Sequence, residues 1–466
     1  NPNSGPKDVS NPKKRNKRNV PSDMVFSAMV SSERSLDQKD AAINQLIAEE
    51  LSSVLEVDVE EILKYDDVIE AKVFAMSSVD FLGKELPKGY LAGVNDPDEG
   101  KHFTEAWLDE KKMLDKFEVF NKKDPVTLTE AKLRGYEILN ADVVWDRKTA
   151  TNIETLETEL SRCKARFVAK ELTGERGKKT YVAFMREATT RLLLGYGFQN
   201  GRKFKLGDYR SAFLHGRHPY WTLIRFPKGL KEYDDAGEEL LYWLEGNLYG
   251  TTTACEVFNT LNRTTLVKIG FVPLKTDKAV YRMAVSGEGI YLIGTHCDDS
   301  LHVPTSDETC EKVFAALRKV FELKGPDPLD IFCGLNIVVS EKTMILHGIP
   351  WIKGRLKKYG LTNADGSVKK ELTIKCPWKG EPADVESPLL EGEEKSVVQS
   401  MVGDAIWMAH KYRPDCQPGT HASARHMSKP TKQSAAWIWQ LWRHVAGTLD
   451  WVIVCHRNAK YLSNPM

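Results

Sequence analysis

Two adjacent carboxylates, Asp298 and Asp299, follow an apolar segment at 290–293 and precede an alternating apolar and polar stretch that Pro304 ends. This pattern predicts a β-hairpin with both carboxylates at its tight turn. An Asp-Asp pair alone is weak evidence for a metal site, because aspartate favours turns for local hydrogen-bonding reasons. The other adjacent pairs, which we interpret as solvated loop or helix-edge features, are Asp66-Asp67 and Asp234-Asp235.

A third carboxylate strengthens the case for a site. Asp208 ends a segment in which Phe204 and Leu206 would share its face if the segment is a strand, so its carboxylate would lie at the end of a buried edge. Two cations roughly 3.5–4 Å apart, held by clustered carboxylates, are what two-metal phosphoryl transfer requires. Hard oxygen ligands of this kind suit Mg²⁺. The alternative is three unrelated surface aspartates, and the residue types by themselves leave it open.

Further motifs accompany these carboxylates in a fixed order along the chain. The first is Asp208-Tyr209-Arg210-Ser211-Ala212-Phe213-Leu214-His215-Gly216, followed by Leu248-Tyr249-Gly250 and then His296-Cys297-Asp298-Asp299. In these motifs the sequence resembles the reverse transcriptases of copia-type LTR retrotransposons. The resemblance is collinear over about residues 100–455, and the other segments that carry it are 164–170, 329–337, 426–431 and 447–450.

The resemblance implies an RNA-directed DNA polymerase that extends a primer 3′-hydroxyl by two-Mg²⁺ nucleotidyl transfer. Asp208, Asp298 and Asp299 would be the catalytic residues and the ligands of both Mg²⁺ ions. The residues implied to bind the substrate are Lys164, Arg166, Tyr209, Phe213, Tyr249 and Gly250. The implied partners are an RNA or DNA template with its primer, dNTPs, and other parts of the Pol polyprotein, namely integrase and RNase H.

The implied substrate residues have ordinary alternatives. Lys164 and Arg166 lie on a strand-like segment and would grip the triphosphate through charge-assisted hydrogen bonds; otherwise they are exposed solubilising cations. The backbone carbonyl of Tyr209 would add a metal ligand. Phe213 would stack beneath the deoxyribose, or it is only a core residue, and both roles can coexist on one ring. Tyr249 and Gly250 would shape the floor under the incoming nucleotide.

Several positions depart from the family pattern. His296 stands two residues before Asp298, where the family has a tyrosine. Cys297, between them, fills a position that is usually aliphatic. The family has motifs of other residue types at the positions that Thr251–Cys255 and 181–185 occupy in this chain. These departures favour, as the alternative to an active polymerase, a decayed or domesticated copy that binds nucleic acid without polymerising, whereas the three retained aspartates argue against it. A third possibility is an assembly scaffold, to which the absence of an RNase H segment lends slight weight. We assign no nearby histidine as a metal ligand, because a neutral, packed histidine is the default.

The expected fold class is α+β, a right-hand polymerase with fingers, palm, thumb and a ferredoxin-like palm sheet. The expected divisions are a basic disordered tail with linker helices at 1–100, fingers at 101–201, palm at 202–340, thumb at 341–420, and the start of a connection toward a missing RNase H at 421–466. The chain begins at Asn1 rather than Met, which suits a piece of a polyprotein or a partial copy.

Periodicity and turn signals predict the elements that would position the site. Strands are expected at 138–147, 163–170 and 343–347, with a loop at 90–101. Helices are expected within 36–64, from Thr104, at 186–196, after Ser306, from Pro350, at 396–411 and at 431–446. The helix after Ser306 should bury one apolar face, and strands on both sides of it indicate the split β-α-β arrangement of a ferredoxin-like sheet.

Composition is that of an ordinary globular protein of 466 residues. The net charge of +1 gives no global field that would attract nucleic acid, so binding must come from local basic faces. The eight cysteines show no zinc-like spacing and are interpreted as reduced thiols. No apolar stretch reaches membrane-spanning length. We therefore expect a cytoplasmic protein, in a virus-like particle by the resemblance, with the nucleus as the alternative.

Overall fold

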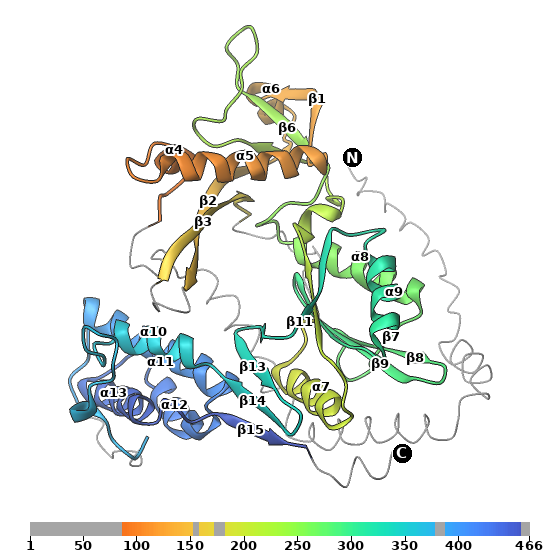
Figure 1. Ribbon diagram of the computed structural model, residues 1–466. Helices are drawn as coiled ribbons and strands as arrows, with labels where there is room; N and C mark the ends of the chain where they lie inside the picture. The colour runs from red at the N-terminus through yellow and green to blue at the C-terminus, as the bar shows by residue number, and fades with distance from the viewer. Residues whose placement is uncertain (1–85, 152–157, 172–181, 378–386, 458–466) are drawn as a thin grey trace, which may run out of the picture. The chain divides into compact units, whose positions relative to one another are not determined.

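A computed structural model describes residues 86–151, 158–171, 182–377 and 387–457. The helices predicted within 36–64 and the basic cluster near the N-terminus lie outside the described residues. The described chain is an α+β structure with three antiparallel or mixed sheets (Figure 1). None of its helices is both long and apolar enough to span a membrane.

The sheet that carries Asp208 and the Asp298-Asp299 pair has six strands in the order β11-β4-β10-β9-β8-β7. Every pairing in it is antiparallel. Its strands are β4 (Lys205–Tyr209), β7 (Val272–Pro273), β8 (Val280–Val285), β9 (Gly289–His296), β10 (Asp299–Val303) and β11 (Leu323–Pro328), and its helices are α7 (Glu187–Gln199), α8 (Ala254–Ile269) and α9 (Asp307–Leu317). β7 and β8 form an added edge hairpin, and β5 (Thr222–Arg225) and β6 (Leu240–Leu244) belong to another sheet. The remaining order β4-α8-β9-β10-α9-β11 is the β-α-β-β-α-β order of a ferredoxin-like unit, as predicted.

Helices cover both faces of this sheet (Figure 1). Aromatic and aliphatic side chains of α8 and α9 pack with one face of the strands, in a core that includes Tyr209, Phe258, Tyr291, Ile293 and Phe314. From the other face, α7 approaches closely at Gly294, where a Cβ atom would lie 3.1 Å from Leu193. Neighbouring residues of a strand face opposite sides, so Ile293 and Gly294 serve different helices.

The local signals around α9 behave as predicted, with one exception. The Ser306 side chain caps the helix by accepting a hydrogen bond from the Thr309 amide. Val313 and Phe314 are buried on the predicted face. Val320 continues the apolar spacing of this helix in the sequence, and that spacing predicts burial, but its side chain is 44 % exposed. It lies beyond the end of the helix at Leu317, so helical periodicity no longer applies to it.

A five-stranded sheet in the order β1-β6-β5-β2-β3 lies under helix α5 and carries the implied triphosphate residues on β3. Alternate β3 residues Ala165, Phe167 and Ala169 are buried, as the sequence pattern predicted. The elements of this region are α4 (Tyr90–Val94), α5 (Gly100–Lys116), β1 (Phe120–Thr127), α6 (Leu128–Leu133), β2 (Glu137–Thr151), β3 (Thr158–Ala169), β5 (Thr222–Arg225) and β6 (Leu240–Leu244).

The prediction of a loop over 90–101 is wrong at both ends, because α4 forms over Tyr90–Val94 and α5 begins at Gly100. Trp145 of β2 donates a hydrogen bond from Nε1 to the Gly89 carbonyl at 2.8 Å. A Cβ atom on Gly93 would overlap the Trp145 ring, so only glycine allows this approach. The short helix is therefore held by a distant tryptophan, and its Gly/Asp/Pro-rich sequence gave no sign of it.

The C-terminal region contains a four-stranded sheet, β12-β13-β14-β15, and several helices. The segment at 329–337, which resembled one family strand, is a hairpin that turns at Cys333 and Gly334, both with positive φ. Of the tryptophans on α13, Trp442 is fully buried, whereas Trp437 and Trp439 are half-buried. The elements are β12 (Ile331–Phe332), β13 (Leu335–Val339), β14 (Thr343–His347), α10 (Ile349–Lys358), η2 (Lys370–Leu372), α11 (Gly392–Lys411), η3 (Pro414–Cys416), α12 (Gln417–Ala424), α13 (Lys432–Gly447) and β15 (Ile453–His456).

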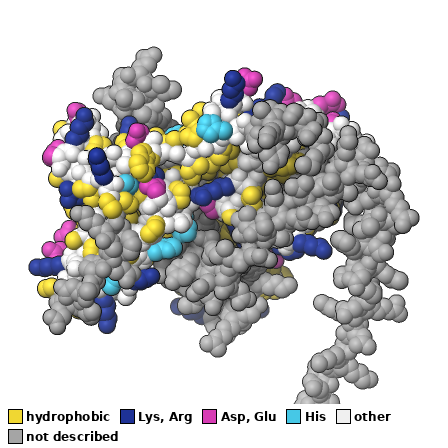
Figure 2. All heavy atoms as spheres, turned by 90° about the horizontal axis from the view of Figure 1, so that it is seen from below, with side chains coloured by type: hydrophobic (Ala, Val, Ile, Leu, Met, Phe, Trp, Pro, Cys, Tyr) yellow, Lys and Arg dark blue, Asp and Glu magenta, His cyan; other side chains and the backbone are white. Residues whose placement is uncertain are grey.

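Charged side chains of both signs are scattered among hydrophobic ones on the face drawn in Figure 2. This mixture matches the net charge of +1. The described part of that face therefore has no extended region of one sign, and any basic surface for nucleic acid must be local.

One buried histidine gives a pH-dependent stability prediction. His302 of β10 lies between the Tyr291 hydroxyl (3.0 Å) and the Ser300 hydroxyl (2.9 Å), and burial lowers its pKa from 6.5 to about 3. The unfolded chain takes up a proton below about pH 6.5 that the folded chain does not. The contribution of His302 to the free energy of unfolding is therefore complete above pH 6.5 and is lost as the pH falls toward 3. Between pH 7 and pH 5 the loss should be about 2 kcal/mol.

Urea unfolding at these two pH values, compared between the wild type and His302→Gln, measures this loss. Gln keeps a neutral polar side chain without the titration. The variant should show a pH dependence smaller by about 2 kcal/mol. Equal pH dependence in both proteins would contradict the assignment.

Candidate active site

Strand pairing brings the three predicted carboxylates together at one end of the six-stranded sheet. Asp208 of β4 and Asp299 of β10 are directly opposite each other in the antiparallel register. The Tyr209 amide donates a hydrogen bond to the Asp298 carbonyl oxygen at 2.7 Å, which fixes the hairpin turn against the end of β4. Two segments far apart in the sequence therefore form one acidic cluster, and the predicted hairpin is present.

The hairpin turn itself holds a strained backbone. His296 and Asp299 pair across it, so Cys297 and Asp298 form the turn. Cys297 has a φ angle of 53°, in the left-handed region of backbone conformation that residues other than glycine rarely adopt. Strain of this kind persists only where surrounding contacts enforce it, and it is concentrated at functional sites. Here the β9–β10 ladder and the Tyr209 hydrogen bond enforce it.

The electrostatics of the cluster favour a cation. Burial, followed by the negative charges of Asp298 and Asp208, raises the pKa of Asp299 from 3.8 to about 7. Carboxylates whose charges act on one another resist simultaneous ionisation unless positive charge joins them. The ligand atoms on offer are hard oxygens, which fit Mg²⁺. The donor set thus suits the divalent cation that the sequence motifs implied.

Tyr249 and Gly250 connect this cluster to strand β3. The Ala169 amide at the end of β3 donates to the Tyr249 carbonyl at 2.8 Å. Gly250 has φ 83°, and a Cβ atom there would overlap the Ala169 carbonyl. The turn therefore requires glycine, both for its backbone conformation and for this close approach.

The phenol of Tyr249 lies among groups from both sheets. Burial, with the nearby Glu110 carboxylate, raises its pKa to about 12, while Arg166 and a hydrogen bond with Ser211 act in the opposite direction. Asp298 also lies close enough to influence it. Tyr249 therefore lies near both Asp298 of the acidic cluster and Arg166 of β3. The sequence motifs had implied that Tyr249 binds the substrate.

The β3 cations face a buried carboxylate that sequence reasoning missed. Glu110 of α5 accepts a hydrogen bond from the Phe167 amide at 2.9 Å and interacts with Arg166 and Lys164. Burial raises the pKa of Glu110, and these interactions lower it only in part. Arg166 and Lys164 are half-buried, so they are not the fully exposed cations of the ordinary alternative.

Phe213 lies on the short helix η1 (Ala212–His215), which follows the left-handed residue Ser211. Its ring contacts Tyr249 edge-on at 5.4 Å between centroids, and Phe258 of α8 at 6.3 Å. The ring is half-buried. Phe213 thus packs on the core and also borders the Tyr249 side of the site, which is compatible with both roles considered from the sequence.

Two of the residues that depart from the family pattern meet beside the acidic cluster. The thiols of Cys297 and of Cys255, at the start of α8, are neighbours. The neighbouring thiol, together with burial and the Asp298 charge, raises the pKa of the Cys297 thiol. Both cysteines and Phe213 line one small cavity. The departures noted in the sequence were the only signal for this contact.

The remaining histidines behave as expected. Burial, followed by the Lys411 charge, lowers the pKa of His296, so its imidazole is neutral. The ring packs against Phe184 at 5.4 Å. Burial also lowers the pKa of His215, whose ring contacts Phe117.

Comparison with known proteins agrees with these motifs. Residues 142–372 match the family described as "Reverse transcriptase (RNA-dependent DNA polymerase)". A relative in Saccharomyces cerevisiae, the putative transposon Ty5-1 protein, is 26% identical over 224 residues, which cover 48% of this chain and 70% of the relative. The matched family region includes all three carboxylates of the cluster.

Proposed function

We propose that this chain, which belongs through residues 142–372 to the reverse transcriptases of LTR retrotransposons, extends a primer 3′-hydroxyl with dNTPs on an RNA or DNA template. The observation that carries the proposal is the pairing of Asp208 with Asp299 across β4 and β10, with Asp298 in the adjoining turn. The element would be of the copia type and the chain a part of its Pol polyprotein, with integrase and RNase H as companions.

Asp208, Asp298 and Asp299 would hold two Mg²⁺ ions. When bound, the ions lower the pKa of the primer hydroxyl and neutralise the triphosphate and the leaving pyrophosphate. The carboxylates supply the negative charge that holds them in place. The Tyr209 carbonyl is a further candidate ligand, and the Tyr209 phenol is anchored away from the site by a 3.0 Å hydrogen bond to Asn262.

The substrate residues take the following roles in this proposal. Arg166 and Lys164 bind the triphosphate in competition with Glu110. Tyr249 and Gly250 form the floor under the nucleotide, and Phe213 contacts its sugar. The corresponding divisions are fingers at 101–201, palm at 202–340, thumb at 341–420 and the start of a connection at 421–466. The ferredoxin-like order of the six-stranded sheet supports the palm assignment.

Primer extension on poly(rA)/oligo(dT) with Mg²⁺ tests the proposal directly. The purified chain should add dTMP in a metal-dependent manner, and a chelator should stop the reaction. Binding of primer-template at low salt without extension would support a decayed copy instead. That alternative draws on the Cys255–Cys297 contact beside Asp298, which replaces family residues next to the metal ligands. Failure to bind at all would indicate a scaffold.

Arg166→Ala should raise the KM for dNTP more than it weakens primer-template binding. Loss of a charge-assisted hydrogen bond costs about 1.5–3 kcal/mol, or roughly 10- to 150-fold. Arg162→Ala is the matched control, since Arg162 is an exposed arginine of the same strand. Steady-state kinetics with varied dTTP, together with primer-template titration, separate the two effects. An unchanged KM for dNTP would leave Arg166 as a partner of Glu110 only.

A further inference from the structure

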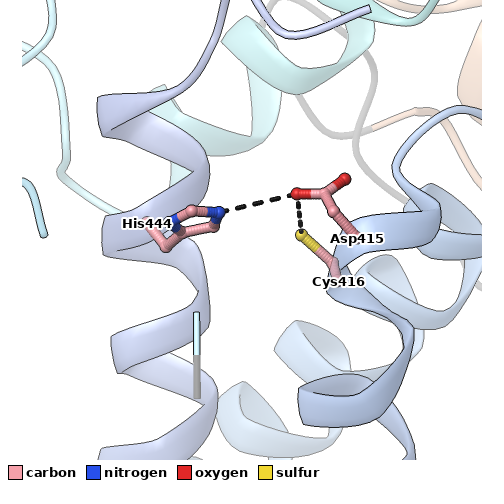
Figure 3. A group of neighbouring side chains, drawn as sticks. All are labelled: Asp415, Cys416 and His444. Atoms are coloured by element: carbon pink, nitrogen blue, oxygen red, sulfur yellow. Dashed lines mark hydrogen bonds and ion pairs between the residues drawn. The ribbon is translucent and has the colours of Figure 1, made fainter. Parts of the chain in front are cut away.

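A second group of potential metal ligands lies in the C-terminal helices. It consists of Asp415 and Cys416 on η3 and His444 on α13 (Figure 3). One ligand atom from each lies within 4.8 Å of the others. Asp415 Oδ2 is 3.5 Å from His444 Nε2 and 3.5 Å from Cys416 Sγ. None of these residues belongs to the acidic cluster of the proposed polymerase.

The separation of Asp415 Oδ2 from His444 Nε2 fits a shared cation better than a direct hydrogen bond, and that of Cys416 Sγ is compatible with either. Zinc bonds of about 2.0–2.3 Å at tetrahedral angles place neighbouring ligand atoms roughly 3.3–3.6 Å apart. A well-formed N–H···O hydrogen bond is instead near 2.9 Å. A carboxylate, a thiol and an imidazole are also the donor types that zinc accepts, whereas Mg²⁺ prefers oxygen alone.

His444 gives independent support, because its ring is buried without a hydrogen-bond partner. The residue is 1 % exposed, and neither Nδ1 nor Nε2 has a partner of normal geometry among the described residues. Figure 3 shows the ring directed toward Asp415. Buried polar atoms are nearly always satisfied, so an imidazole nitrogen that lies 3.5 Å from a carboxylate oxygen without forming a hydrogen bond indicates a missing partner.

Arg413 holds the carboxylate in place. Its guanidinium is buried and donates to both Asp415 oxygens, at 2.9 and 2.7 Å, and to the Thr448 carbonyl and hydroxyl. Arg413 therefore orients the carboxylate, as partners outside a metal's own ligands commonly do.

Solvent can reach the group from one side. A hollow of about 450 Å³ is lined by Arg413, Asp415, Asp450 and Trp451. Cys416 and His444 are buried and do not line the hollow, so solvent reaches the group at Asp415. A tetrahedral ion with three protein ligands needs one more donor, and water in this hollow can supply it.

We propose that Asp415, Cys416 and His444 bind one zinc ion, with water as the fourth ligand. The thiol loses its proton to the solvent when the metal binds. The ion joins η3 to α13 and so stabilises this helical region. This site is independent of polymerase activity and remains testable if that activity is absent.

Cobalt substitution of the full-length chain tests the site. The chelator-stripped protein, titrated with Co²⁺, should develop a thiolate-to-cobalt charge-transfer band and tetrahedral d–d bands that saturate at one cobalt per chain. Zn²⁺ should displace them. Cys416→Ser and His444→Asn should each weaken cobalt binding by at least about tenfold. Cys376→Ser, at an exposed cysteine, and Cys255→Ser, at the thiol pair beside Asp298, should leave the bands unchanged.

A second measurement does not depend on how well the variants fold. Saturating Zn²⁺ should raise the Tm of the wild type by on the order of 2–5 °C. Absence of the cobalt bands in the wild type, or their persistence in Cys416→Ser, would overturn the proposal. Loss of the bands in Cys255→Ser, with retention in Cys416→Ser, would place the metal at Cys255 and Cys297 instead.

Discussion

Asp298→Asn should reduce primer extension by at least about a thousandfold while the chain stays folded. Asn keeps the shape of the side chain but removes a charge that offsets the two proposed metal ions. Stabilisation of the transition state by such ions is worth several kcal/mol. The fold should survive because the hydrogen bond from the Tyr209 amide goes to the Asp298 backbone carbonyl, which the substitution retains. Extension rates at saturating Mg²⁺ and dNTP measure the effect.

The matched control is Asp235→Asn. Asp235 also belongs to an Asp-Asp pair, but it lies exposed in a loop. Its neighbour Asp234 accepts hydrogen bonds from the Ala236 and Glu238 amides, which confirms that pair as a turn feature. Extension by the control should match the wild type. Normal extension by Asp298→Asn would contradict the two-metal assignment, and equal loss in both variants would indicate a general defect.

Phe213→Val should lower the preference for dNTP over rNTP by roughly a hundredfold while largely sparing the use of dNTP. A ring beneath the deoxyribose leaves no room for a 2′-hydroxyl, which would meet a clash and lack a hydrogen-bond partner. Together these penalties are worth a few kcal/mol where water is excluded. The ring of Phe213 contacts Tyr249, which is proposed to lie under the incoming nucleotide. The measurement is the ratio of kcat/KM for dNTP and rNTP.

Phe258→Leu separates packing from sugar selection. Phe258 of α8 is 3 % exposed, and its ring packs against the ring of Phe213. Among the ring contacts of the described residues, none joins Phe258 to Tyr249. This variant should lose some stability yet keep the selectivity ratio. If the ratio is unchanged in Phe213→Val, or falls equally in both variants, Phe213 is a packing residue and selection against ribonucleotides lies elsewhere.

The sequence by itself determined the local elements and the residue types of the site. Alternation of Ala165, Phe167 and Ala169 gave strand β3, and the Ser306 cap gave the start of α9. The apolar run before Asp298 gave the hairpin and its turn. These succeeded because capping and side-chain periodicity depend on neighbours a few residues apart. The motif order also gave the family, whereas the domain divisions and the roles of the site residues stay predictions.

Only the tertiary structure decided which residues meet. The pairing of Asp208 with Asp299, the contact of Cys255 with Cys297, the Glu110 carboxylate beneath Arg166, and the group around His444 all join segments distant in the chain. The failed loop prediction at α4 has the same origin, since Trp145 holds that helix. Such contacts arise from strand register and from packing of whole elements, and neither leaves a periodic signal in the residues that take part.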